Sequence, residues 1–179
     1  MNIRVAGFEK ESVVDGPGIR YVIFTQGCPH GCPGCHNPAT HDFLGGILMD
    51  TGEILQDIKK HSYLSGVTFS GGDPFIQPEP VLEIATVVKG HGLSVVLYSG
   101  FTYEELLVLG EKNSAISQLL QVGDLLVDGK FRLEEKDLSL AFRGSLNQRL
   151  VDLQRSRIEE KTILWQMESE KALHWLNKK

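Results

Sequence analysis

The sequence predicts an α/β fold with a mainly parallel sheet, arranged as a partial, open (β/α) barrel. Runs of β-branched and aromatic residues alternate along the chain with segments of helical spacing, which is typical of parallel sheets. Polar or glycine-rich motifs directly follow successive predicted strands, as they do on the face of a β/α barrel that carries active sites. A chain of 179 residues is too short for a full barrel, so the barrel should be incomplete.

The predicted strands cover residues 19–25, 67–69, 93–98 and 125–127. The predicted helices cover residues 51–61, 80–89, 102–109 and 114–121. Thr51 is the expected N-cap of the first helix, and Thr102 with Glu105 forms the sequence pattern of a capping box. Towards the C-terminus, 149–153 and 161–167 are compatible with strands and 168–177 with a helix. We expect one domain over 1–179, with 154–179 as a C-terminal extension whose structure periodicity does not settle.

The composition is that of an ordinary soluble globular protein, with 41% hydrophobic and 23% charged residues. A formal net charge of −5 gives no general attraction to nucleic acid or to an anionic membrane, so we expect neither as a partner. The N-terminus has no apolar signal-peptide core, and no apolar run is long enough to span a bilayer. The chain has 3 cysteines in one tight cluster, which argues against a disulfide framework and favours a reducing cytoplasm.

These cysteines, Cys28, Cys32 and Cys35, lie in the loop GCPHGCPGCHNP with the spacing C-x3-C-x2-C. Three thiolates on a loop rich in Gly and Pro can hold one face of a metal centre, but they cannot complete a four-sulfur site. In a [4Fe-4S] cluster with three cysteine ligands, one iron has no protein ligand and is open to a small molecule. The alternative is a zinc site in which His30 or His36 is the fourth ligand.

Four further motifs are weak signals when each is taken alone. SGGDP at 70–74 places two glycines after a strand, where the backbone can approach a ligand closely. DGPGIR at 15–20 is typical of a turn before a strand. VDGKF at 127–131 and FRGSLNQR at 142–149 are polar loops that would ordinarily be solvated.

Taken in order over most of residues 3–153, these motifs resemble the radical S-adenosylmethionine (SAM) superfamily. Within it they closely resemble the anaerobic ribonucleoside-triphosphate reductase-activating proteins, whereas pyruvate formate-lyase activases are longer and lack the RGSxNQR segment. The resemblance implies a radical SAM type of barrel, a [4Fe-4S] cluster on Cys28, Cys32 and Cys35, and no catalytic residue beyond the cluster and SAM. The SAM-binding residues that it implies are Gly34, Cys35, His36, Gly71, Gly72, Asp73 and Lys130.

The resemblance also implies a reaction and its partners. A flavodoxin or ferredoxin reduces the cluster, and an electron then breaks a C–S bond of SAM to give a 5′-deoxyadenosyl radical. That radical removes hydrogen from a glycine in the glycyl-radical subunit of anaerobic ribonucleoside-triphosphate reductase. The alternatives are an activase of another glycyl-radical enzyme such as pyruvate formate-lyase, a radical SAM enzyme acting on a small molecule, and a zinc module without catalysis.

Two positions depart from the pattern of the wider superfamily. Gly34 replaces an aromatic residue that packs on the adenine, and Asp73 stands where many members carry Glu. The segment 142–149 follows the strands expected to form the SAM site, so we do not expect it to contact SAM. The segment is expected either to shape the open edge of the barrel or to help receive the glycine loop of the reductase. The structural alternative is that Arg143 and Arg149 brace the C-terminal strands.

Overall fold

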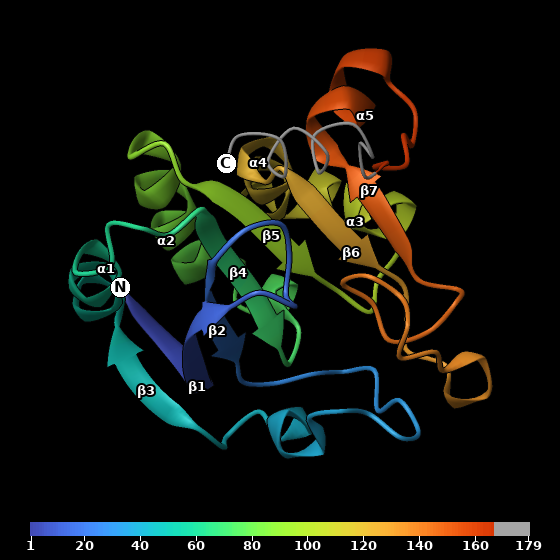
Figure 1. Ribbon diagram of the computed structural model, residues 1–179, viewed down its shortest axis with the longest axis horizontal. Helices are drawn as coiled ribbons and strands as arrows, with labels where there is room; N and C mark the ends of the chain where they lie inside the picture. Colours follow the sequence, from blue (N-terminus) through green and yellow to red (C-terminus); the bar gives the residue numbers. More distant parts are fainter. Residues whose placement is uncertain (167–179) are drawn as a thin grey trace, which may run out of the picture.

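The computed structural model describes residues 1–166, and its centre is a seven-stranded sheet of order β3-β1-β2-β4-β5-β6-β7 (Figure 1). The strands are β1 (Asn2–Ser12), β2 (Arg20–Thr25), β3 (Ile47–Asp50), β4 (Gly66–Gly71), β5 (Ser94–Tyr98), β6 (Leu125–Asp128) and β7 (Arg149–Asp152). Strands β2, β4, β5 and β6 run parallel, whereas β1, β3 and β7 pair antiparallel with their neighbours. The predicted α/β class is confirmed, and the parallel arrangement holds for the four central strands.

The four central strands are the four that the sequence predicts, and each matches its predicted position to within two residues. These strands are buried on both faces of the sheet, so their sequences are continuous apolar runs that can be recognised as strands. Strands β1 and β3 are not predicted. Strand β3 is an edge strand in which Ile47 and Leu48 are exposed, so its sequence carries no alternation of apolar and polar residues.

All four predicted helices are present, although their ends differ by one to three residues. The helices are α1 (Thr51–Lys59), α2 (Pro78–Gly90), α3 (Tyr103–Lys112), α4 (Ser114–Val122) and α5 (Leu153–Glu159), with 3-10 turns at η1 (Pro38–His41), η2 (Pro74–Ile76) and η3 (Leu133–Glu135). The capping box of Thr102 and Glu105 is confirmed at the start of α3. Thr51 is not the N-cap of α1. The Asp50 side chain takes that role by accepting a hydrogen bond from the Gly52 N–H at 2.9 Å, and the Thr51 hydroxyl binds Glu83 instead.

Helices α1 to α4 pack on one face of the sheet and enclose the hydrophobic core. Side chains on the central strands alternate between this face and the other, and the core-facing ones are Tyr21, Ile23, Val67, Phe69, Val95 and Leu97. Burial of these side chains supplies the main stabilisation of the fold.

The opposite face of the sheet is covered by the segment 13–19, which contains most of DGPGIR. The Asp15 carbonyl accepts a hydrogen bond from the Thr68 hydroxyl at 2.8 Å, and a Cβ on Gly16 would contact Val96. Arg20 is fully buried and donates to the Thr68 hydroxyl and to the carbonyls of Val67 and Ser94, so it ties the start of β2 to β4 and β5. Burial lowers the pKa of Arg20 to about 10.

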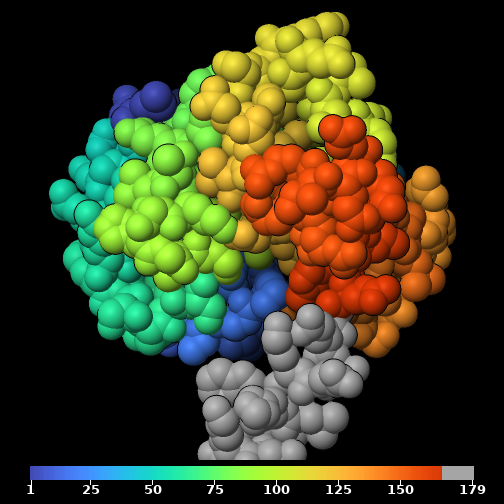
Figure 2. Space-filling view, turned by 90° about the horizontal axis from the view of Figure 1, so that it is seen from above, coloured from blue at the N-terminus to red at the C-terminus, as the bar shows by residue number. Residues whose placement is uncertain are grey.

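The C-terminal part follows the predictions only at first. Strand β7 confirms the strand expected at 149–153, but helix α5 is not predicted. The strand expected at 161–167 is wrong for 161–166, because that segment forms a single bridge, Leu164 to Val151. Residue 167 and the predicted helix 168–177 lie outside the described residues. Helix α5 packs beside α4, and Figure 2 shows this red segment next to the orange-yellow surface of α4.

Within residues 1–166, no helix is both long and apolar enough to cross a membrane.

Candidate active site

The loops that follow β2, β4, β5 and β6 border one cavity of about 530 Å³. In Figure 1 these strands point towards the side of the molecule where the blue cysteine loop and the orange segment after β6 lie. The wall includes all three cysteines, Gly71 and Gly72 at the end of β4, Ser99 and Gly100 after β5, and Gly129 after β6. The expectation that the motifs gather at the carboxyl ends of the parallel strands is therefore confirmed.

The cysteine loop exposes its three thiols to this cavity. Cys28, Cys32 and Cys35 are all half-buried and unpaired. The loop turns between them through Gly31 and Gly34, which have φ angles of +57° and +71°, a region that favours glycine. The Asn37 N–H donates to Cys35 Sγ at 3.4 Å, a contact that stabilises a thiolate. Burial raises the pKa of the Cys28 thiol, which disfavours its thiolate form in the absence of a cation.

The donor set fits a [4Fe-4S] cluster held by three thiolates. The three thiols share one cavity, and the rest of that cavity leaves room for a ligand beside them. The two histidines considered as a fourth ligand have other contacts. The ring Nε2 of His30 lies 2.8 Å from the Asp73 carboxylate, and the His36 ring packs on Phe131 with 5.1 Å between ring centroids. In residues 1–166, no three His, Cys, Asp or Glu side chains are grouped as ligands of a single ion.

Asp73, a predicted SAM contact, is fully buried and does not border the cavity. One carboxylate oxygen meets His30 Nε2 and accepts hydrogen bonds from the Ser99 hydroxyl at 2.8 Å and the Gly100 N–H at 3.1 Å. The other oxygen accepts from the Phe75 N–H and caps the turn η2. Asp73 therefore joins the loops that follow β2, β4 and β5.

The two glycines of SGGDP approach the base of the cysteine loop. A Cβ on Gly72 would lie 2.4 Å from the Gly27 carbonyl oxygen, and a Cβ on Gly71 would lie 2.7 Å from Phe24 Cα. The Gly72 N–H donates to the Thr25 carbonyl at 2.8 Å. Both glycines also border the cavity, so the same backbone meets the cysteine loop on one side and the cavity on the other.

Three predicted SAM contacts remain to be placed. His36 borders the cavity beside Cys35. Gly34 does not, and a Cβ there would lie 2.8 Å from Leu133. Lys130 is exposed and also lies outside the wall, and its carbonyl accepts a hydrogen bond from the Asn147 side chain.

The segment 142–149 folds back over the cavity, contrary to its expected position beyond the site. Phe142, Arg143, Gly144 and Gln148 all border the cavity. The Tyr98 hydroxyl holds the Phe142 carbonyl at 2.7 Å, and a Cβ on Gly144 would lie 3.0 Å from the His36 ring. The Gln148 amide accepts from the Gly144 N–H and donates to the Gly129 carbonyl, which closes the segment onto the loop after β6.

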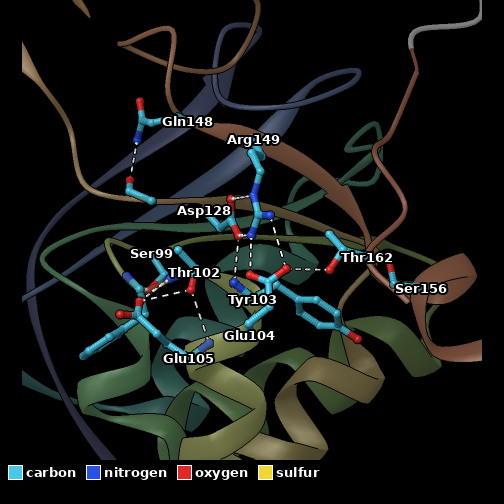
Figure 3. A network of polar contacts seen from close by, with 12 residues as sticks. Ser99, Thr102, Tyr103, Glu104, Glu105, Asp128, Gln148, Arg149, Ser156 and Thr162 are labelled. Atoms are coloured by element: carbon cyan, nitrogen blue, oxygen red, sulfur yellow. Dashed lines mark hydrogen bonds and ion pairs between the residues drawn. The ribbon is translucent and has the colours of Figure 1, made fainter. Parts of the chain in front are cut away.

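Arg149 has a different environment at the outer side of β6 and β7. Its guanidinium donates to Asp128 Oδ1 at 2.9 Å and to Glu104 Oε2 at 2.6 Å, and Thr162 also donates to Glu104 (Figure 3). This contact lowers the pKa of Glu104 to about 2 and raises the pKa of Arg149. Asp128 is fully buried and also accepts the Tyr103 N–H at 2.7 Å. For Arg149, the contacts therefore agree with the alternative expectation that the arginine braces the C-terminal strands.

Sequence reasoning missed several residues of the wall, among them His41, Tyr98 and Phe131. Tyr98 ends a predicted strand and Phe131 lies within VDGKF, so both have a local signal. His41 lies six residues after Cys35 and has no such signal.

Comparison with known proteins agrees with this geometry. A family model described as a 4Fe-4S single cluster domain matches residues 14–151. The anaerobic ribonucleoside-triphosphate reductase-activating protein of Salmonella typhi is 34% identical over 151 residues, covering 76% of this chain and 90% of that protein. The protein of the same name in Enterobacteria phage T4 is 35% identical, covering 76% of this chain and 86% of that protein.

A pyruvate formate-lyase-activating enzyme of Clostridium pasteurianum is 38% identical over a shorter stretch, covering 58% of this chain and 48% of that enzyme. Among solved structures, QueE from Escherichia coli matches 57% of this chain and 54% of its own, at 20% identity and a TM-score of 0.46. Because the matches to the reductase-activating proteins span nearly their whole length, this chain belongs to the family of anaerobic ribonucleoside-triphosphate reductase-activating proteins.

Proposed function

We propose that this protein is a radical SAM activase that generates a glycyl radical on an anaerobic ribonucleoside-triphosphate reductase. The observation that carries the proposal is the convergence of three unpaired thiols on one cavity, in a chain that has no other cysteine. Such a set leaves one iron of a [4Fe-4S] cluster free for a small ligand. Membership of the reductase-activating family supports the choice of substrate protein.

Cys28, Cys32 and Cys35 would hold the cluster in this proposal. When bound, the cluster and SAM supply the one-electron chemistry that converts a glycine of the reductase into a radical. Of the predicted SAM contacts, Cys35, His36, Gly71 and Gly72 border the cavity, and we retain them as such. Gly34 and Lys130 do not border the cavity, so the cavity wall supports no SAM contact for either of them.

Asp73 acts as a positioning residue in this proposal. Its carboxylate holds His30 of the cysteine loop and the Ser99–Gly100 turn, so the two sides of the cavity keep a constant separation.

The open sheet also supports a finer description of the fold as a partial barrel of the radical SAM type. Strands β3 and β7 are its edges among the described residues, so one side is left open. A loop of a large protein needs such an opening, whereas a small substrate does not. A flavodoxin or ferredoxin is our proposed electron donor, and three unpaired thiols favour a reducing cytoplasm.

The test uses anaerobically purified protein with a reconstituted cluster, SAM, a reductant and an anaerobic ribonucleoside-triphosphate reductase, observed by electron paramagnetic resonance. We expect a glycyl radical signal that requires both SAM and this protein. Parallel reactions replace the reductase with pyruvate formate-lyase or omit any protein substrate. A radical on the lyase alone would assign the other activase reaction, and SAM cleavage to completion without a protein substrate would favour a small-molecule enzyme.

A further inference from the structure

An exposed apolar strip, residues 43–48, leads from η1 into β3 at the edge of the sheet (Figure 1). Its four large side chains are exposed to 51% at Phe43, 82% at Leu44, 64% at Ile47 and 56% at Leu48. Single exposed apolar residues are common on protein surfaces, whereas a group of them is typical of an interaction site. The proposed function assigns no task to this strip.

The backbone of the 43–48 strip is fixed, although its side chains are exposed. Asp42 Oδ1 accepts the Leu44 N–H at 2.9 Å, and Arg4 Nη1 donates to the carbonyls of Leu44 and Gly45 at 3.1 Å each. From Ile47 onward the chain pairs with β1. A partner would therefore meet a preformed apolar surface, and little ordering of the chain would oppose binding.

The strip lies against the base of the cysteine loop. A Cβ on Gly27 would lie 3.1 Å from the Phe43 ring, so these two residues pack closely. The Gly27 N–H donates to the Thr40 carbonyl at 2.8 Å, and the Cys28 N–H donates to the His41 carbonyl at 3.5 Å. The segment that carries the strip is therefore hydrogen-bonded to the backbone of a proposed cluster ligand.

The four apolar side chains of the strip do not border the cavity. The exposed apolar segment after β6 differs in this respect, because its Leu138 and Leu140 do border the cavity. The cysteine loop is thus reached from two sides, through the cavity and from the strip. An occupant of the strip would approach the cysteines without displacing SAM or the glycine of the reductase.

The size of the strip restricts its occupant. Four partly exposed side chains offer roughly half of the about 800 Å² that each partner buries in a stable complex. A second copy of this chain would need a larger apolar surface to form a stable dimer here. Weak, transient complexes of electron-transfer proteins have interfaces below the stable size. The strip therefore fits a redox partner better than a permanent subunit.

We propose that the 43–48 strip is the docking surface of the one-electron donor protein. This inference rests on the proposed function, which requires such a donor, and it gives the donor a surface separate from the SAM cavity. In the docked complex the reduced donor loses one electron, and the cluster held by Cys28, Cys32 and Cys35 gains it. Electron transfer weakens steeply with distance, so docking against the base of the cysteine loop favours it.

The test measures how fast reduced flavodoxin and reduced ferredoxin each reduce the cluster-loaded protein, by anaerobic stopped-flow absorbance. The strip variant is Leu44→Gln/Ile47→Thr, and the matched control is Leu107→Gln/Val108→Thr, two exposed apolar residues of α3. We expect the strip variant to slow reduction by the faster donor about 10-fold, because two apolar contacts are lost. The control should react like the wild type. Reduction by dithionite, which needs no docking, should be the same in all three proteins.

Calorimetric titration of the oxidised donor into the cluster-free protein gives a second measurement, in which the strip variant should bind about 10-fold more weakly. Iron content and thermal unfolding are measured on every variant. Equal reduction rates in wild type and strip variant, equal slowing with dithionite, or reduction of the wild type by neither donor would overturn the inference. Weaker binding of the reductase, or a changed sedimentation of this chain, with unchanged donor rates would assign the strip to the reductase or to a second copy instead. A wild type that forms no glycyl radical even with dithionite would contradict the proposed function itself, so the two failures are distinct.

Discussion

Arg143 and Arg149 lie six residues apart in one polar segment, yet the structure gives them opposite environments. Arg149 donates to two carboxylates at the junction of β6, β7 and α3 (Figure 3). Arg143 borders the cavity with one hydrogen bond and a buried unpaired Nε. The comparison shows that an arginine paired with carboxylates, as at Arg149, holds together β6, β7 and α3, which we call the frame. An arginine without such partners, as at Arg143, leaves donors for a ligand. Changes in the frame should affect stability, and changes in the cavity wall should affect ligands.

The largest expected effect lies in the cavity. We expect Cys32→Ala to abolish SAM cleavage and to prevent formation of an intact [4Fe-4S] cluster, because the chain has no other cysteine to replace the ligand. Iron and sulfide analysis with electron paramagnetic resonance measures the loss. The thermal unfolding of the metal-free wild type and variant should coincide, since the thiol is half-buried on a loop. An intact cluster in Cys32→Ala would remove this residue from the ligand set.

The next effect lies in the frame. Arg149→Ala leaves the fully buried Asp128 carboxylate without its cation and should lower the free energy of unfolding by about 3 kcal/mol. Denaturant unfolding of the metal-free protein measures this change. Arg155→Ala is the control, because Arg155 pairs with Glu159 on the exposed face of α5 and should contribute less than about 1 kcal/mol. If both variants lose the same small amount, Arg149 does not brace the sheet.

A third prediction concerns the boundary between the two regions. Gly72→Ala should destabilise the protein by about 1–3 kcal/mol and also lower cluster occupancy, because its Cβ would lie 2.4 Å from the Gly27 carbonyl beside Cys28. Gly90→Ala places a Cβ in open space at the end of α2 and should be neutral or slightly stabilising. Iron content and unfolding of both variants are compared. A destabilised Gly72→Ala variant with full cluster occupancy would show that this backbone contributes to stability but not to cluster binding.

The smallest predicted effect is a pH dependence of the frame. The pKa of Glu104 falls from 4.5 to about 2 on folding because Arg149 donates to it. A lowered folded pKa gives stability that is present above the unfolded pKa and disappears as the pH falls through the folded value. The stability difference between wild type and Arg149→Ala should therefore be constant above about pH 5 and shrink between pH 5 and 2. A stability difference that stays constant down to pH 2 would show that the contact between Glu104 and Arg149 does not contribute to stability.

The sequence was sufficient for the parts of the fold that local patterns determine. The four parallel strands are buried on both faces, so their apolar runs stand out, and the motifs behind them locate the cavity. Strands β1 and β3 were not predicted because they are partly exposed. Helix α5 was not predicted for a similar reason, since it is short and most of its residues are accessible to solvent.

The remaining errors concern contacts between residues far apart in the chain. Nothing near Asp73 in the sequence shows that its carboxylate will meet His30 and Ser99 instead of bordering the cavity. The return of the segment 142–149 depends on the Tyr98 hydroxyl, 44 positions from the carbonyl that it binds. Residue spacing alone cannot predict such tertiary hydrogen bonds.

The antiparallel strands at the two flanks have a consequence for how this fold could change in evolution. A parallel sheet lengthens when another β/α unit is added at its edge. Here β1 on one side and β7 on the other run opposite to the parallel block, and the β6–β7 register places Asp128 opposite Arg149. An inserted unit would have to separate that ion pair and leave a buried carboxylate alone. Duplication or insertion of units is therefore blocked at this flank, and new specificities would have to arise by exchanging loops.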